Sequence, residues 1–187
     1  VLSNVPFRAP KNFEQAWSVC FFAPPLACGR QLEYMKQGIF LINLGSPDSP
    51  TKEDVRTYLD EFLMDPRVVD LPKVFRTLLV RGIILNTRPK KSAEAYAEIW
   101  TEDGSPLIVY SEKVRDLLQP RLDMPVVLGM RYGSMSIEKG LAQLADHGVE
   151  HALIIPLYPQ FAMSTTETVV EKVKEVVHAS HPGMKTE

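Results

Sequence analysis

The stretch from Ala152 to Thr168, ALIIPLYPQFAMSTTET, constrains the fold of this chain more than any other. Its apolar run extends through Leu157 with no polar residue, which is typical of a parallel strand covered on both faces. A loop follows, and the sequence from Ser164 to Glu167 matches a capping box, which predicts that a helix begins there. In open parallel sheets, ligands bind where strand ends meet helix starts. We therefore expect a candidate site at this loop, with an ordinary turn between strand and helix as the alternative.

Length, charge and composition exclude several classes of protein. A chain of 187 residues with 45% hydrophobic residues can bury one core, so one domain is expected. The net charge of −2 gives no polybasic signal, and we expect no nucleic-acid partner. No segment approaches the ~18 apolar residues that a membrane span needs. The two cysteines, Cys20 and Cys28, are too few for a disulfide framework and favour a cytoplasmic location.

The first 34 residues differ from the rest of the sequence. They carry four prolines and show no sustained hydrophobic period. We predict that residues 1–34 are a disordered extension or an artefact of upstream translation. Met35 would then be the natural start, and residues 35–187 would form the folded α/β domain.

From Gly38 onward, segments with the patterns of strands and helices alternate. We predict strands at 38–44, 125–130 and 151–157. We predict a helix that starts at Ser49-Pro50 or at Thr51, and further helices over 71–85 with a break near Gly82, and over 92–100, 111–122, 136–147 and 165–179. Gly148 is expected to end the helix over 136–147. This order predicts a Rossmann-like, doubly wound parallel sheet with right-handed crossovers.

The sequence lacks the motifs of nucleotide-binding sheets. The first strand is followed by NLGSPDSP rather than GxGxxG, and GxxxxGK[ST] does not occur. Pro47 and Pro50 also remove backbone donors that a phosphate cradle would need. A nucleotide ligand is therefore not expected.

Aromatic and polar residues gather instead at the predicted strand ends. Arg131 and Tyr132 follow the second strand, and Tyr158 and Gln160 follow the third. A basic cluster over 88–91 precedes another aromatic residue and a Gly-Ser-Pro turn. Aromatic rings offer flat apolar contacts, while cations and helix N-termini attract carboxylates. Each residue alone has a plain structural explanation, but together they suit a large, flat, anionic ligand.

The same residues carry a family resemblance. NLGSPDSPTKEDVRTYLDEFLMDPRVVD, RPKKSAEAY, EDGSPLIVYS, GMRYG and IPLYPQFAMSTTET, in this order, resemble ferrochelatase. That family inserts ferrous iron into a porphyrin in the last step of protohaem synthesis. The resemblance covers Gly38 to Glu187 and implies the flavodoxin-like chelatase fold. It implies Fe²⁺ and a porphyrin as substrates, with protoporphyrin IX favoured over the alternative, coproporphyrin. It also implies no organic cofactor, and it is compatible with peripheral membrane association of the full-length protein.

The resemblance also implies which residues contact the porphyrin. These are Leu63, Met64, Arg88, Lys91, Ser105, Arg131, Tyr132, Tyr158, Gln160 and Ser164. Arg131 would pair with a propionate group and Tyr132 would lie at the macrocycle. Leu63 and Met64 would belong to a mobile lip at the mouth of the cleft.

The chain resembles only the N-terminal half of a ferrochelatase. The catalytic histidine of the family is expected beyond Glu187, and its glutamate partner in the second half. We interpret His178 and His181 as exposed residues near the end of the last helix, so we predict no catalytic residue and no metal ligand within the chain. The fragment is then expected to be inactive alone. Two alternatives stay open, a half-chelatase that acts as a dimer and a non-catalytic α/β module that binds anions.

Overall fold

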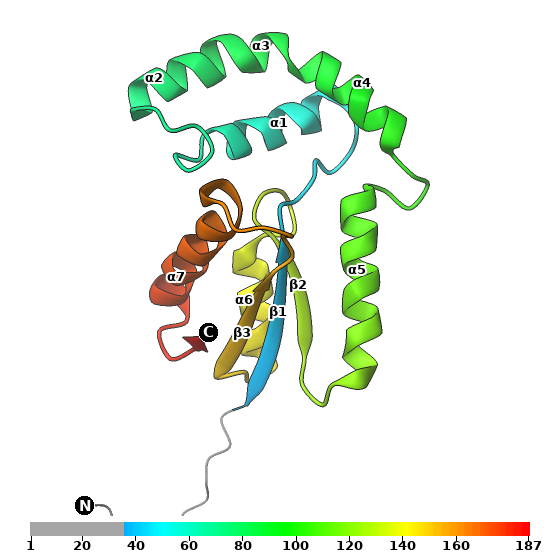
Figure 1. Ribbon diagram of the computed structural model, residues 1–187, viewed down its shortest axis with the longest axis vertical. Helices are drawn as coiled ribbons and strands as arrows, with labels where there is room; N and C mark the ends of the chain where they lie inside the picture. Colours follow the sequence, from blue (N-terminus) through cyan, green and yellow to red (C-terminus); the bar gives the residue numbers. More distant parts are fainter. Residues whose placement is uncertain (1–35) are drawn as a thin grey trace, which may run out of the picture. The chain divides into compact units, whose positions relative to one another are not determined.

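The computed structural model of the chain describes residues 36–187 (Figure 1). The predictions for residues 1–34, for the start at Met35 and for the two cysteines lie outside the described residues. The elements, in chain order, are β1 Gln37–Asn43, α1 Lys52–Leu63, α2 Lys73–Thr77, the π-helix η1 Leu78–Ile84, α3 Leu85–Thr87, α4 Pro89–Ile99, α5 Pro106–Leu118, the 3₁₀ turn η2 Gln119–Arg121, β2 Val126–Met130, α6 Ile137–Asp146, β3 His151–Pro156, the π-helix η3 Met163–Glu167, α7 Thr168–Ser180 and β4 Lys185–Thr186.

The four strands form one parallel sheet in the order β2-β1-β3-β4. Ile39 of β1 pairs with Val126 of β2 on one side and with Leu153 of β3 on the other. Helix α5 lies on one face of the sheet, and α6 and α7 lie on the other (Figure 1). The predicted α/β fold with a parallel, doubly wound sheet is confirmed.

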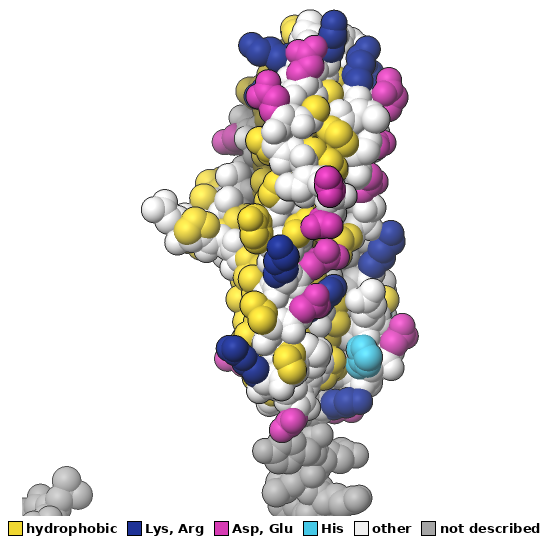
Figure 2. Space-filling model, turned by 90° about the vertical axis from the view of Figure 1, so that its right-hand side faces the viewer, with side chains coloured by type: hydrophobic (Ala, Val, Ile, Leu, Met, Phe, Trp, Pro, Cys, Tyr) yellow, Lys and Arg dark blue, Asp and Glu magenta, His cyan; other side chains and the backbone are white. Residues whose placement is uncertain are grey.

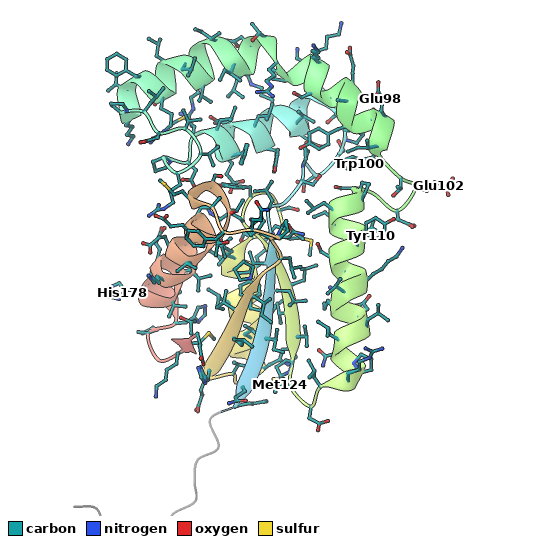
Figure 3. The ribbon with its side chains drawn as sticks, viewed as in Figure 1. Glu98, Trp100, Glu102, Tyr110, Met124 and His178 are labelled. Carbon is teal, nitrogen blue, oxygen red and sulfur yellow. The ribbon has the colours of Figure 1, made fainter. Side chains whose placement is uncertain are left out.

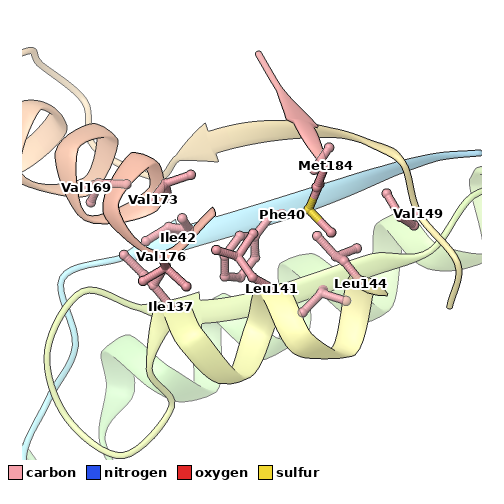
Figure 4. Packing of buried hydrophobic residues seen from close by; sticks show 12 residues of the cluster. Phe40, Ile42, Ile137, Leu141, Leu144, Val149, Val169, Val173, Val176 and Met184 are labelled. Atoms are coloured by element: carbon pink, nitrogen blue, oxygen red, sulfur yellow. The ribbon is translucent and has the colours of Figure 1, made fainter. Parts of the chain in front are cut away.

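The main core lies between the sheet and the pair α6 and α7. Phe40 and Ile42 of β1 point to this face because side chains alternate along a strand. They pack against Leu141 of α6 and Val169 of α7, which are fully buried (Figure 4). Ser136 caps α6 by accepting a hydrogen bond from Lys139 N, and Gly148 follows the helix with φ +72°. The predicted helix and its glycine stop are thus confirmed.

The opposite face of the sheet is covered less completely. Leu41 and Leu128 are buried beneath α5, but Leu153 of β3 is 44% exposed. The prediction that β3 is covered on both faces is therefore wrong. The buried residues of the α5 cluster belong to β1 and β2, and β3 adds only partly buried residues. Figure 2 shows the side of the molecule that carries α5, with hydrophobic side chains exposed among charged ones.

A helical excursion, α1 to α4, lies above the carboxyl ends of the strands (Figure 1). Thr51 caps α1 by accepting a hydrogen bond from Asp54 N, as its sequence predicts. The expected break near Gly82 is wrong, because Gly82 lies inside η1, where the helix widens without ending. Helices α4 and α5 begin earlier than predicted, at Pro89 and Pro106, since proline is favourable in the first turn.

The start of the last helix also differs from its prediction. Ser164 does not cap it, because Ser164 lies inside the π-helical turn η3 and no side chain caps this turn. The backbone N–H groups of Thr165 and Glu167 donate instead to the carbonyl of Ala162. The α-helical part therefore begins only at Thr168. No helix in the described part of the chain is long and apolar enough to cross a bilayer.

Candidate functional site

An aromatic groove lies at the carboxyl ends of the strands, between the end of β1 and the helices α1 and α4. We call it the aromatic groove and define it by its lining residues, Leu44, Tyr58, Leu59, Phe62, Arg88, Ser92, Ala95, Tyr96 and Ile99. Its volume is about 370 Å³. Ligands of doubly wound sheets bind at this edge of the sheet, so the groove lies where a ligand is expected.

The rings of the groove form a continuous series. Tyr58 and Phe62 stack with 6.1 Å between their ring centroids, and Tyr96 meets Tyr58 edge-on at 6.4 Å. Trp100 extends the series from Tyr96 at 6.4 Å. On the other side Phe62 meets Tyr132 edge-on at 5.2 Å. Paired rings hold one another in place, so the groove has a preformed aromatic wall.

The loops after β1 and β2 touch through their backbones beside this wall. The N–H of Tyr132 donates to the carbonyl of Leu44 at 3.0 Å. Gly45 has φ +106°, and a Cβ atom there would lie 1.9 Å from the carbonyl oxygen of Tyr132. The hydroxyl of Tyr58 donates to the carbonyl of Gly45 at 3.3 Å, and burial raises the pKa of Tyr58. Only glycine fits this position.

A second, smaller pocket of about 210 Å³ adjoins Trp100 and Tyr132. Ser105, at the start of α5, and Ser46, in the loop after β1, line it. Both serines are buried, and Ser46 Oγ has no hydrogen-bond partner among the described residues. Asp48 and Asp103 stand exposed at the same pocket, so its polar lining carries both hydroxyls and negative charge.

Arg131 and Met64 lie in a third cavity, a polar cleft of about 680 Å³ that Tyr132 also lines. The guanidinium of Arg131 donates from Nη2 to Asp65 Oδ2 at 2.6 Å and from Nε to Thr168 Oγ1 at 2.8 Å. Its side chain is 14% exposed. The structure thus brings Arg131 to an internal partner, Asp65, that the sequence patterns did not single out.

The remaining predicted site residues are spread more widely. Leu63 is buried in the core beneath α1 rather than at the rim of a cavity. Lys91 is exposed on α4, and Gln160 is exposed in the loop after β3. Tyr158 packs against the α6–α7 core, its hydroxyl has no partner among the described residues, and burial raises its pKa to about 12. Of the ten predicted residues, only Arg88 lines the aromatic groove.

The four histidines of the chain do not line these three cavities. His147 ends α6 and His151 begins β3, at the opposite end of the sheet from the groove. His178 is exposed on α7 (Figure 3), as predicted, whereas His181, which follows that helix, is partly buried and not exposed as predicted. Among residues 36–187, no group of three or more His, Cys, Asp or Glu side chains is placed to hold a metal ion.

Sequence reasoning missed most of the groove. Leu44, Tyr58 and Phe62 lie on one short span of sequence, but the helical spacing of the two rings is equally typical of a helix face that packs into the core. Tyr96 stands near the basic cluster in the sequence, where no pattern gave it a role of its own. A core stripe and a groove wall have the same spacing, so the pattern alone could not separate them.

The fold and these cavities define a doubly wound α/β protein with an aromatic groove at the carboxyl ends of its strands. The ferrochelatase family model matches residues 36–187. A ferrochelatase of Azotobacter vinelandii is 54% identical over 143 residues, and one of Pseudomonas aeruginosa (strain LESB58) is 50% identical over 151 residues. A ferrochelatase of Bordetella pertussis is 46% identical over 155 residues. The chain belongs to the ferrochelatase family.

The matches cover most of this chain and less than half of each relative. They span 76%, 80% and 80% of the chain, and 42%, 44% and 41% of the three ferrochelatases respectively. The activity and substrates of the whole protein are therefore taken up as proposals.

Proposed function

We propose that this chain supplies the porphyrin-binding wall of a ferrochelatase, which inserts Fe²⁺ into protoporphyrin IX as the last step of protohaem synthesis. The observation that carries the proposal is the aromatic groove, which lies at the carboxyl ends of the strands in a chain of the ferrochelatase family. Both porphyrin and Fe²⁺ are substrates in this proposal, and no organic cofactor takes part.

The groove has the chemistry that a porphyrin requires. The macrocycle is flat and apolar, and the faces and edges of Tyr58, Phe62 and Tyr96 offer matching contacts. The propionate groups are anionic, and Arg88 is an exposed cation on the lining of the groove. An arginine can bind a carboxylate through two parallel hydrogen bonds. The propionate role predicted for Arg131 and the contacts predicted for the other residues stay predictions.

The contribution of this wall to catalysis is to favour one shape of the porphyrin. Metal insertion requires that the pyrrole nitrogen lone pairs tilt out of the ring plane, and a wall that fits the bent ring better than the flat ring lowers the barrier. The two pyrrole protons must leave to a base. Because the four histidines lie away from the groove, we infer that this chain binds porphyrin but does not insert iron alone.

A titration with protoporphyrin IX tests the binding proposal. The expected result is a saturable shift of the Soret band. In a Trp17→Phe chain, which keeps Trp100 as its one tryptophan, quenching of tryptophan fluorescence is also expected, since Trp100 adjoins the groove through Tyr96. An iron-insertion assay with the same chain is expected to show no turnover above the uncatalysed rate. A chain that leaves the Soret band unchanged at high protein concentration would contradict the proposal.

The two alternatives give different results in the same experiments. A half-chelatase would insert iron and would sediment as a dimer in analytical ultracentrifugation. A general anion-binding module would bind small dicarboxylates as well as it binds porphyrin. Turnover by the chain alone would favour the first alternative, and equal binding of small anions would favour the second.

Peripheral contact with a membrane has its own support in the helical excursion. Val74 and Phe75 of α2 are 76% and 64% exposed, and they lie between two further exposed apolar residues, Leu71 just before α2 and Leu78 at the start of η1. An apolar stripe of this kind suits the surface of a bilayer. We therefore propose a cytoplasmic protein that contacts a membrane through α2.

Co-sedimentation with anionic vesicles tests this contact. The parent chain is expected to sediment with the vesicles, and a smaller fraction of Phe75→Asp is expected to do so. Leu117→Asp, an equally exposed apolar residue on α5, is the matched control.

A further inference from the structure

The carboxylate of Asp65 is the most heavily bonded side chain among the described residues. Its side chain is 3% exposed and lies in the turn after α1. Oδ2 accepts hydrogen bonds from Arg131 Nη2 at 2.6 Å, from the Tyr132 hydroxyl at 2.9 Å and from Thr168 Oγ1 at 2.6 Å. Oδ1 accepts from the backbone N–H of Arg67 at 2.8 Å. A buried carboxylate with this many donors has its charge fully compensated inside the protein.

These bonds join three segments that are far apart in the sequence. Asp65 follows α1, Arg131 and Tyr132 follow β2, and Thr168 begins α7. Thr168 Oγ1 donates to Asp65 and accepts from Arg131 Nε at 2.8 Å, and the Thr168 carbonyl accepts from the same nitrogen at 3.2 Å. The guanidinium also lies 4.4 Å from the centroid of the Tyr132 ring. Arg131 is therefore held on several sides by groups of its own chain.

The same network reaches the aromatic groove through Tyr132. Its hydroxyl is fixed by Asp65, and its ring meets Phe62 edge-on at 5.2 Å. Phe62 in turn stacks on Tyr58 inside the groove. The position of the Phe62 ring thus depends on the Tyr132 ring, and the hydroxyl of Tyr132 is held by the buried carboxylate of Asp65. Without the Asp65 carboxylate, Arg131 would be a largely buried charge with no counter-ion in this network, and the Tyr132 hydroxyl would lose the acceptor that holds it.

We propose that Asp65 is a positioning residue for the porphyrin groove, which keeps Arg131 as an internal counter-ion and holds Tyr132 against Phe62. In this arrangement Arg131 shapes the wall, and Arg88 is the cation that meets a propionate group. The inference rests on the proposed function, because the ligand is the porphyrin. It adds to that function a division of roles. Asp65 and Arg131 fix the shape of the groove, and Arg88 binds the anionic group of the ligand.

Two ligands distinguish these roles, protoporphyrin IX and its dimethyl ester, titrated in the same detergent-containing buffer. Asp65→Asn is expected to weaken the binding of both ligands by the same factor, about tenfold, because the wall and not a carboxylate contact is lost. Thr168→Val removes one bond to Asp65 and one from Arg131 and is expected to weaken both about threefold. Thr168→Ser, which keeps the hydroxyl, is expected to restore binding to within twofold of the parent chain.

Asp70→Asn is the matched control, since Asp70 is an exposed aspartate in the same turn. It is expected to bind both ligands like the parent chain. If Asp65→Asn does not fold, as judged by far-UV circular dichroism, the comparison rests on the valine and serine variants of Thr168.

Three outcomes would overturn the inference. Variants that fold and bind both ligands like the parent chain would show that the network does not position the groove. Weakening that appears with the free acid alone would make Arg131 a propionate ligand whose position Asp65 sets. If the parent chain binds neither porphyrin, both the proposed function and this inference fail. The parent chain is titrated first, so this outcome is known before any variant is compared.

Discussion

The ring of Phe62, on α1, meets the ring of Tyr132, after β2, edge to face with 5.2 Å between the ring centroids. Through this contact, α1 of the helical excursion packs against the loop after β2 beside the aromatic groove. Phe62 is only partly buried, whereas Tyr132 is 1% exposed and bonded at its hydroxyl. The sheet therefore supplies a fixed ring, and the excursion supplies the ring that a ligand can touch.

Phe62→Ala is expected to weaken porphyrin binding about tenfold, because the aromatic contact between this ring and the macrocycle, worth roughly 0.5–1.5 kcal/mol beyond its buried area, is lost. The neighbouring rings Tyr58 and Tyr132 also lose the ring against which they pack. Phe62→Leu, which keeps apolar volume but not the flat face, is expected to lie between the parent and the alanine variant. Fluorescence titration with protoporphyrin IX measures both. Equal affinity of all three chains would place the porphyrin elsewhere.

Arg88→Gln is expected to weaken the binding of protoporphyrin IX about threefold, since an exposed ion pair contributes roughly 0.2–1 kcal/mol. The dimethyl ester carries no carboxylate, so its affinity should not change. The loss should also shrink as salt is added, because salt screens exposed charges. Lys90→Gln, at an exposed position two residues away, is the control for a general effect of charge. A loss of the same size in that variant would assign the effect to the overall basic charge.

Gly45→Ala is expected to destabilise the chain by about 3 kcal/mol or more, because the backbone adopts φ +106° and the new Cβ would meet the Tyr132 carbonyl. Urea unfolding followed by circular dichroism measures the free energy of unfolding. Gly104 also has a positive φ, of +113°, but has open space around its Cβ direction. Gly104→Ala should therefore cost less. A larger loss at Gly104 than at Gly45 would contradict the role of the close contact.

Acid is expected to remove the stabilising effect of Asp65. Burial raises the pKa of its carboxyl, but hydrogen bonds from Thr168, the Arg67 N–H and Tyr132, with the charge of Arg131, together hold the pKa below 3.8. A group whose pKa is lower in the folded state stabilises the fold above its unfolded pKa and loses this effect as the pH falls through the folded value. The unfolding free energies of the parent and Asp65→Asn should therefore converge below roughly pH 4. A difference that stays constant down to pH 2 would contradict this origin.

Much of the sheet could be predicted from the sequence because its determinants are local. The runs that form β1 and β2 are short, apolar and bounded by turn residues, and both strands begin and end within about a residue of the prediction. The exposure of one face of β3 could not be predicted from local sequence. Leu153 looks like a buried strand residue in sequence, and only the position of α5 over β1 and β2 leaves it open.

The site was harder to predict because its residues are brought together by tertiary contacts. Arg88 could be expected from its basic cluster, and it does line the groove. Asp65 had only a local signal, a residue before proline at the end of a helix. Its bonds to Arg131 and Thr168 depend on how the excursion sits above the sheet. Likewise, the sequence at Ser164 predicts a capping box, but in the structure Ser164 lies inside the π-helical turn η3.

The wide turn η1 also sets the angular phase of the helices that come after it. A π-helical turn holds more residues than an α-helical one, so α3 emerges rotated relative to a regular continuation of α2. Each residue of an α-helix advances the chain by about 100° around its axis. Because the wide turn takes up one extra residue, deleting one exposed residue between Leu78 and Ile84 would make the helix regular and would leave Leu85 in the core that it now enters. A deletion within the regular helix α4 would instead rotate every later residue by about 100°. The segment η1 can therefore lose a residue with Arg88 still at the groove, whereas the regular helices around it cannot change length without a second change.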